Sequence, residues 1–211
     1  MDMLGIHDYG LFVATGILLN LTPGQDTFYI LGRSIAQGTR MGVASACGIA
    51  AGSLVHTAMA AVGLSALLAT SAQAFTVVKL VGAAYLVYLG VRMLTAPGVA
   101  SGLASGNGTD SARAAFREGA LVNVLNPKVA LFFLALMPQF IEPTSDTKVL
   151  AFLALGLTFV ATGIVWCLVL AVWAGRARHL LTMHPPVLHG VSRIAGGLFI
   201  LLGLRLAASR Q

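Results

Sequence analysis

The chain has 211 residues, of which 57% are hydrophobic and only 9% are charged, and its formal net charge is +6. Soluble domains carry about 25% charged residues, so this composition excludes a water-exposed globular surface and predicts a single membrane domain over residues 1–211. The positive charges lie in short connections between apolar runs, without a basic stripe and interleaved aromatic residues, so nucleic acid is not an expected partner.

Six apolar segments follow one another along the chain, and each is near the ~20 residues that a helix needs to cross the hydrocarbon core of a membrane. They span residues 10–32, 41–69, 74–95, 116–139, 148–174 and 188–208. Residues 96–115 are rich in Gly, Ser, Ala and Asn, a composition typical of a flexible linker. We therefore predict a three-helix half at 1–95, the linker at 96–115, and a second three-helix half at 116–211.

Lys and Arg are unevenly distributed among the connections. The first, third and fifth connections are basic, with Arg40, Arg113 and Arg176 among their residues, whereas the second and fourth are not. Cytoplasmic loops of membrane proteins are enriched in Lys and Arg, so we expect both termini to lie outside the cytosol. No small-residue cleavage site follows the first apolar run, and a cleaved signal peptide is therefore not expected.

The first segment is interrupted by "LTPGQD", residues 21–26. Pro23 removes a backbone donor and Gly24 loosens the helix, and the freed polar groups cannot face lipid. Asp26 follows within one turn, where a carboxylate near the bilayer centre costs on the order of 2.5–3.5 kcal/mol. Two roles remain open for Asp26: it caps the half-helix after the break, or it binds a substrate ammonium group or a proton.

The second segment carries His56 on a face that also holds Gly48, Gly52 and Ala60. Small residues at this spacing predict close packing against another helix. His56 is then either a hydrogen-bonded packing residue or a proton relay.

A second break is predicted at "NVLNPK". Pro127 interrupts the fourth segment, with Asn123 and Asn126 before it and Lys128 after it. If the second half of the chain is inverted in the membrane relative to the first, Asp26 and Lys128 approach the same region from opposite sides. Either the two form a salt bridge that locks the halves together, or they bind a zwitterion, with its ammonium on Asp26 and its carboxylate on Lys128, Asn126 and freed backbone amides.

The remaining side chains of chemical interest favour plain packing roles. Trp166 and the pair Phe132 and Phe133 are predicted to pack rather than to form the walls of a pocket. Cys47 and Cys167 lie in apolar runs and are expected to be buried, without the spacing of a disulfide or a metal site. The histidines of the fifth connection have no acidic partners, so neither a metal nor another cofactor is expected.

The two halves of the chain resemble each other. Residues of one type keep an offset of 104 positions in three pairs: Pro23 and Pro127, Phe28 and Phe132, Gly52 and Gly156. Three helices in each half require the second copy to be inverted in the membrane. We therefore predict an all-α membrane protein with six transmembrane helices in a 3+3 inverted repeat, whose first and fourth helices are broken at proline.

Four stretches resemble, in order, the motifs of the lysine exporter family (LysE/RhtB type). "LTPGQD" is similar to its Pro-Gly-Pro-Asp signature, with Gln25 in place of the second proline. "GTRMGVASACGIAAGSLVH" and "KLVGAAYLVYLGVRML" resemble its second and third helices, and "FREGALVNVLNPKVALFFLALMPQFI" resembles its Asn-Pro-Lys block. The resemblance implies a six-helix inverted repeat in a bacterial inner membrane that exports amino acids or close derivatives, driven by the proton gradient. It carries over six residues: Pro23, Gly24, Asp26, Asn126, Pro127 and Lys128.

We interpret the chain as a secondary transporter rather than an enzyme, with an amino-acid-like molecule, protons and membrane lipid as its partners. Its predicted substrate and proton site consists of Asp26, Lys128, Asn126, Asn123 and His56. A passive pore for small polar solutes is the alternative, although a channel is expected to carry the Asn-Pro motif in both halves. A membrane redox carrier is disfavoured because the two cysteines are not related by the repeat. The small-residue faces suit either a homodimer or packing within one chain.

Overall fold

The computed structural model describes residues 4–64 and 111–176, together with single helical positions at 77, 80, 84, 87, 88, 91, 200, 201 and 204. This part of the chain is helical and contains no strand, and an isolated antiparallel bridge joins Ile6 to Ile141. Most of the linker and most of the third and sixth predicted segments lie outside the described residues. The number of helices therefore stays a prediction.

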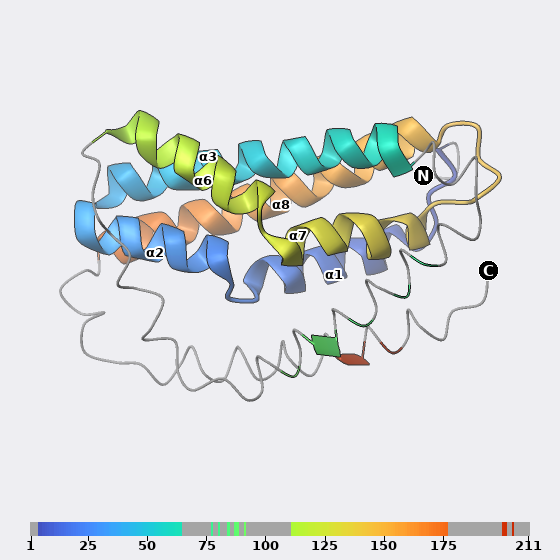
Figure 1. Cartoon of the computed structure of the whole chain (residues 1–211), viewed down its shortest axis with the longest axis horizontal. Coiled ribbons are helices and arrows are strands. Elements are labelled where there is room, and N and C mark those ends of the chain that lie inside the picture. The colour runs from blue at the N-terminus through green and yellow to red at the C-terminus, as the bar shows by residue number, and fades with distance from the viewer. Residues whose placement is uncertain are drawn as a thin grey trace.

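The described helices follow the apolar segments in chain order (Figure 1). The α-helices are α1 (Tyr9–Leu21), α2 (Gln25–Gln37), α3 (Thr39–Met59), α6 (Ala112–Val124), α7 (Pro127–Leu131) and α8 (Lys148–Arg176). A π-helical turn, η2 (Ala60–Leu64), continues α3, and α7 is continued by the π-helical η4 (Phe132–Leu136) and the 3₁₀-helix η5 (Met137–Phe140).

The helices lie side by side along the long axis of the molecule, and α1–α2 runs in the direction opposite to α6–α7 (Figure 1). Among the described residues, Thr39–Gly63 and Lys148–Arg176 are long and apolar enough to cross a membrane. A third span is added if Ala112–Val124 and Pro127–Phe140, which meet at a bend of 47°, are counted as one.

Helices α3 and α6 approach each other through glycines. A Cβ atom at Gly48 would lie 2.0 Å from the carbonyl oxygen of Phe116, and one at Gly119 would lie 2.6 Å from that of Ser45. Such distances leave no room for a side chain, so the two backbones are in direct contact. The close packing predicted for the face of Gly48 and Gly52 is confirmed.

Aromatic rings fill the core where α1, η4 and α8 meet. The Phe132 ring lies 5.9 Å from that of Phe12 and 4.7 Å from that of Phe159, and Phe133 contacts the Phe159 ring edge-on at 5.5 Å. Phe132 and Phe133 are almost completely buried. The packing role predicted for this pair is confirmed.

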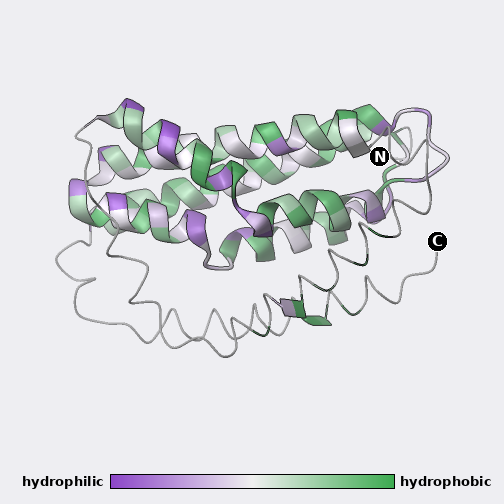
Figure 2. Cartoon of the chain, in the orientation of Figure 1, coloured by the Kyte–Doolittle hydropathy of each residue, from purple (hydrophilic) through white to green (hydrophobic). Residues whose placement is uncertain are grey.

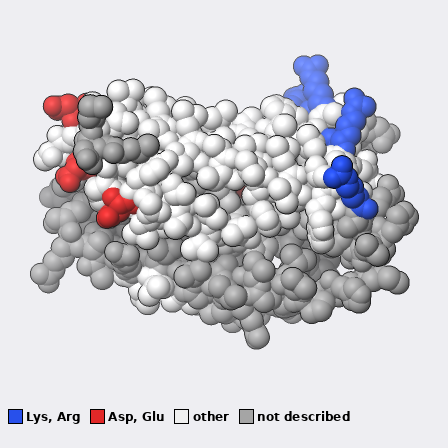
Figure 3. All heavy atoms as spheres, turned by 180° about the vertical axis from the view of Figure 1, so that it is seen from behind, with Lys and Arg blue, Asp and Glu red and all other residues white. Residues whose placement is uncertain are grey.

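The outer surface has the polarity of a membrane protein. Large apolar side chains such as Val62 and Val165 are 73% and 63% exposed, whereas monomeric soluble proteins seldom expose broad apolar patches. Figure 2 shows hydrophobic residues along the helices, and hydrophilic ones at the ends and near the middle of the bundle. In Figure 3, Lys and Arg gather at one end of the molecule and Asp and Glu at the other.

We call these the basic end and the acidic end. The basic end contains the α2–α3 connection, the start of α6 and the end of α8, with Arg40, Arg113, Arg117 and Arg176. The acidic end contains the start of α1 and the segment before α8, with Asp8, Glu142 and Asp146. Hydrogen bonds from His7 N to Phe140 O (3.1 Å) and from Glu142 N to Gly5 O (2.8 Å) join these two segments.

Candidate functional site

Polar backbone groups meet in the middle of the bundle, where two pairs of helices are joined by short interruptions. Helix α1 ends at Leu21 and α2 begins at Gln25, whereas α6 ends at Val124 and α7 begins at Pro127. Each helix end leaves backbone donors or acceptors without partners inside its own helix. Pro127 stands at the first position of α7, where its missing N–H is not needed.

Lys128 donates hydrogen bonds to backbone carbonyl groups at the C-terminal end of α1. Its side chain is buried, and Nζ donates to the carbonyl oxygens of Leu19 (3.2 Å) and Thr22 (2.9 Å). These carbonyls belong to the C-terminal end of a helix, which carries a partial negative charge and favours a cation. The side chain reaches them by passing Gly24, where a Cβ would lie 3.1 Å from Nζ. Two of the three ammonium hydrogens are therefore engaged by backbone from the first half of the chain.

Asn126 directly precedes α7 and is not among the residues that line the cavity described below. Its side-chain Oδ1 accepts a hydrogen bond from the backbone N–H of Lys128 at 3.0 Å, which makes it the N-cap of that helix. Its Nδ2 is buried and has no hydrogen-bond partner among the described residues. Asn126 Oδ1 thus caps α7, and the predicted contact between Asn126 and a substrate carboxylate stays a prediction.

Asp26 lies in the first turn of α2 and is held by Asn123. Asn123 Nδ2 donates to Asp26 Oδ2 at 2.9 Å, and Ser53 Oγ donates to Asn123 Oδ1 at 3.1 Å. The second carboxylate oxygen, Asp26 Oδ1, is buried and accepts no hydrogen bond in the described part of the chain. The carboxylate is thus oriented through one oxygen and has a free acceptor on the other.

His56 lies within hydrogen-bond distance of the backbone carbonyl group of the same asparagine. His56 Nε2 lies 3.1 Å from the carbonyl oxygen of Asn123, and the imidazole ring stacks on Phe133 at 5.6 Å between centroids. The side chain is buried and does not line the cavity. Of its two predicted roles, this conformation corresponds to the hydrogen-bonded packing residue.

Asp26 and Lys128 line one cavity without touching each other. The ion pairs within 4.0 Å among the described residues are His7–Asp8 and Arg33–Glu118. A direct salt bridge between Asp26 and Lys128, one of the two predicted alternatives, is therefore not formed.

The cavity lies between α1, α2, α3, α6, α7 and α8, and about 30 Å³ of it is open to the centres of water molecules. About two waters fit into such a space. Its polar side chains include Asp26, Ser53, Asn123 and Lys128, and the remaining wall is largely apolar.

Trp166 also lines this cavity, so the prediction that it is only a packing residue was wrong. Its indole Nε1 is buried and has no hydrogen-bond partner in the described part of the chain. Cys167 lines the cavity next to it, whereas Cys47 is exposed on α3 and not buried as expected. The helical rotation that turns Trp166 inward and Cys47 outward is not encoded in an evenly apolar sequence.

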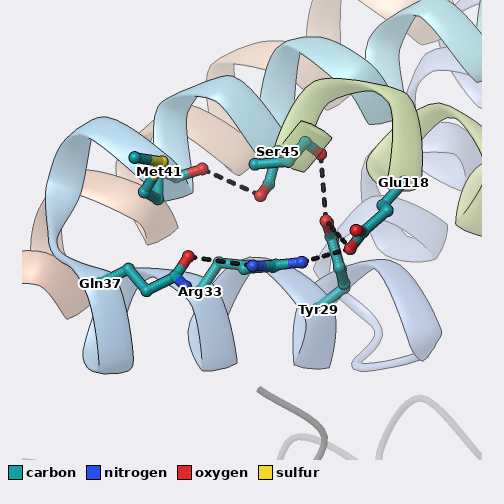
Figure 4. A network of polar contacts seen from close by, with 7 residues as sticks. Tyr29, Arg33, Gln37, Met41, Ser45 and Glu118 are labelled. Carbon is teal, nitrogen blue, oxygen red and sulfur yellow. Dashed lines mark hydrogen bonds and ion pairs between the residues drawn. The ribbon is translucent and has the colours of Figure 1, made fainter. Parts of the chain in front are cut away.

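A second polar cluster joins α2 to α6, and its residues were not among the predicted site residues (Figure 4). Arg33 is only 4% exposed, and its Nη2 pairs with Glu118 Oε2, while Nη1 donates to Gln37 Oε1 at 3.0 Å. Tyr29 Oη donates to the same Glu118 oxygen at 3.1 Å. A carboxylate within the fourth apolar segment was the available signal, because an acid in a membrane segment needs a partner.

The arrangement is that of a membrane translocator, with a small cavity that combines a few polar groups with an apolar wall where interrupted helices meet. The family described as LysE type translocator matches residues 17–210, and the chain therefore belongs to this family of efflux proteins.

Three relatives match over nearly their whole length. A homoserine/homoserine lactone efflux protein of Salmonella typhimurium is 34% identical over 95% of this chain and 96% of its own. A leucine efflux protein of Salmonella choleraesuis is 27% identical over 96% of each chain. A membrane protein of Vibrio cholerae is 33% identical over 98% of this chain and all of its own. No solved structure matches the chain.

Proposed function

We propose that this protein is a secondary transporter that exports small neutral amino acids, or close derivatives, from the bacterial cytosol in exchange for protons. The observation that carries the proposal is the cavity at the helix interruptions, where Asp26 presents an unused carboxylate oxygen inside a largely apolar wall. A buried carboxylate with a free acceptor suits either an ammonium group or a proton, and an antiporter needs both in turn. The names of the Salmonella relatives support export of amino acids.

The charges of the cavity favour a substrate without a charged side chain. Asp26 and Lys128 are the charged groups among the described lining residues. An α-ammonium and an α-carboxylate balance this pair, whereas a third charge would be buried without a partner, which is costly. The apolar wall around them, with Ile49 and Ile164, suits an aliphatic side chain.

We further propose a 3+3 inverted repeat of six transmembrane helices, with halves at 1–95 and 116–211 joined by the linker 96–115. The opposite directions of α1–α2 and α6–α7 support this architecture (Figure 1). So does the register of the interruptions, because Thr22 and Asn126, and likewise Gly24 and Lys128, are also 104 positions apart. The second pair is complementary, since the missing side chain at Gly24 leaves the space that Lys128 occupies.

Transport requires the cavity to open, because sites that enclose a small molecule have volumes of roughly 300–1,000 Å³. The pair Arg33–Glu118 lies on α2 and α6 between the cavity and the basic end. We propose that the basic end faces the cytosol and that this pair closes the cavity on that side. An exporter would load its substrate when the pair separates and release it when the acidic end opens.

Everted membrane vesicles test this proposal. With an imposed pH gradient, vesicles containing the protein are expected to accumulate labelled leucine or homoserine above the outside concentration. The variant Asp26→Asn keeps the shape of the side chain but loses the charge, and we expect accumulation to stop. The exposed Asp146→Asn is the matched control and should accumulate normally.

Equilibration without accumulation would instead support the passive pore. Full accumulation by the Asp26→Asn variant would remove this carboxylate from the mechanism.

A further inference from the structure

Trp166 carries a buried hydrogen-bond donor that nothing in the described part of the chain uses. Its indole Nε1–H is closed off from solvent on α8, and the residue lines the same cavity as Asp26. An indole nitrogen can only donate, and buried tryptophan N–H groups usually have a partner. Because Trp166 lines the cavity, a molecule bound there is the candidate partner for this hydrogen bond.

The cavity thus offers a matched pair of unused polar atoms. Asp26 Oδ1 is an acceptor without a donor, and Trp166 Nε1 is a donor without an acceptor. The neighbouring polar groups are more fully occupied, because Asn123 Nδ2 is bonded to Asp26 and Lys128 Nζ is bonded to two backbone carbonyls. A ligand that uses both free atoms needs a donor at one end and an acceptor at the other.

We propose that Trp166 is a specificity-determining residue that binds the carboxylate of the substrate through its indole N–H, while Asp26 binds the ammonium group. This inference rests on the proposed function, because it assigns an amino acid to the same cavity. Trp166 takes the place predicted for Asn126, which is not among the residues that line the cavity, as the neutral donor to the carboxylate, and Lys128 adds its positive charge nearby. The site then distinguishes a free amino acid from an analogue whose carboxylate is blocked.

The comparison of leucine with leucinamide tests this hydrogen bond, since both have the same side chain and ammonium group, but the acceptor is a charged carboxylate in leucine and a neutral carbonyl in leucinamide. Dissociation constants are measured by calorimetry on the purified full chain in detergent. The variant Trp166→Phe retains an aromatic ring and loses the N–H. We expect leucine to bind about tenfold more weakly or worse, as for loss of a hydrogen bond to a charged group, while leucinamide, whose neutral carbonyl accepts a weaker bond, loses clearly less affinity.

Trp173→Phe is the matched control, because Trp173 lies on the same helix and is 56% exposed. It should bind both compounds as the wild type does. Equal weakening of leucine and leucinamide by Trp166→Phe would show a packing defect and overturn the assignment. Unchanged affinity for both would mean that the N–H meets only water, which overturns it as well.

A measurement on the wild type avoids any dependence on the folding of the variant. The chain has two tryptophans, so ¹⁵N-labelled protein gives two indole N–H resonances, which Trp173→Phe assigns. Leucine should shift the Trp166 resonance strongly and leucinamide only weakly, and equal shifts would contradict the proposal. If the wild type neither binds nor transports leucine or homoserine, the proposed function fails together with this assignment. Binding without a Trp166 response overturns the assignment alone.

Discussion

At the scale of single residues, Lys128 both lines the cavity and stabilises the contact between two helices. Its ammonium group joins the end of α1 to the start of α7 through the carbonyls of Leu19 and Thr22. Removing the ammonium group leaves the buried Thr22 carbonyl without this donor, whereas Leu19 O keeps the backbone N–H of Thr22. Leaving a buried acceptor unpaired costs about 1–3 kcal/mol of folding free energy. We therefore expect Lys128→Met to unfold at a clearly lower temperature in detergent and to lose transport.

Lys148→Met is the control for this prediction. Lys148 Nζ also donates to a backbone carbonyl, that of Ser145 at 2.9 Å, but the contact is only partly buried. Its loss should change the melting temperature little, since water can replace the lysine. Equal melting temperatures for the two variants would show that the Lys128 contacts do not stabilise the fold.

Residue types and spacing were enough to predict that Asp26 and Lys128 lie in one region, because each follows a proline break and the two breaks correspond at the offset of 104 between the halves. Their partners could not be predicted in the same way. Lys128 binds backbone carbonyls, which carry no sequence signal, and Asp26 is held by Asn123 from another helix. The inward position of Trp166 depends on the rotation of α8, and nearly every face of that helix is apolar.

At the scale of helices, the contact between α3 and α6 depends on Gly48. A Cβ at this position would lie 2.0 Å from the Phe116 carbonyl oxygen, so an alanine at position 48 would force the backbones of α3 and α6 apart. Overpacking of this kind costs about 1–3 kcal/mol. We expect Gly48→Ala to lower the melting temperature and the yield of folded protein. Gly32→Ala has open space around it on α2 and should be neutral or stabilising, and the same loss in both variants would refute the packing argument.

The Arg33–Glu118 pair joins α2 to α6 and makes a prediction about access to the cavity. Glu118→Gln removes one charge of the pair, so the two helices should separate more often at the basic end. Cys167, which lines the cavity, is a natural reporter once exposed Cys47 is replaced by alanine. In everted vesicles, we expect a membrane-impermeant maleimide to label Cys167 several times faster in Glu118→Gln.

The control for this experiment is Glu142→Gln at the acidic end, which should leave labelling from the vesicle exterior unchanged. If Glu118→Gln also leaves the labelling rate unchanged, the pair is a static connection between the helices rather than part of a closure.

Helix positions were easier to predict than their continuity. Helix α8 begins at Lys148, where the fifth apolar segment was predicted to begin, because hydrophobicity alone marks a span. The π-helical and 3₁₀ turns after α7 had no such signal. They arise where Phe132, Phe133 and Met137 are drawn into the core, and tertiary packing of this kind overrides local preference.

At the scale of the whole molecule, the separation of charge along the bundle predicts its orientation. Figure 3 shows Lys and Arg at one end and Asp and Glu at the other. Arg113 near the start of α6 and Arg176 at the end of α8 belong to the basic end, and Asp146 just before α8 belongs to the acidic end. Since Lys and Arg are retained on the cytosolic side, the acidic end should face outward. In a Cys47→Ala background, Asp146→Cys should react with an impermeant maleimide in intact spheroplasts, and Arg113→Cys only in everted vesicles. The reverse pattern would show the opposite orientation in the membrane. The Arg33–Glu118 pair would then close the cavity on the outer side, which contradicts the proposal that substrate enters from the cytosol when this pair separates.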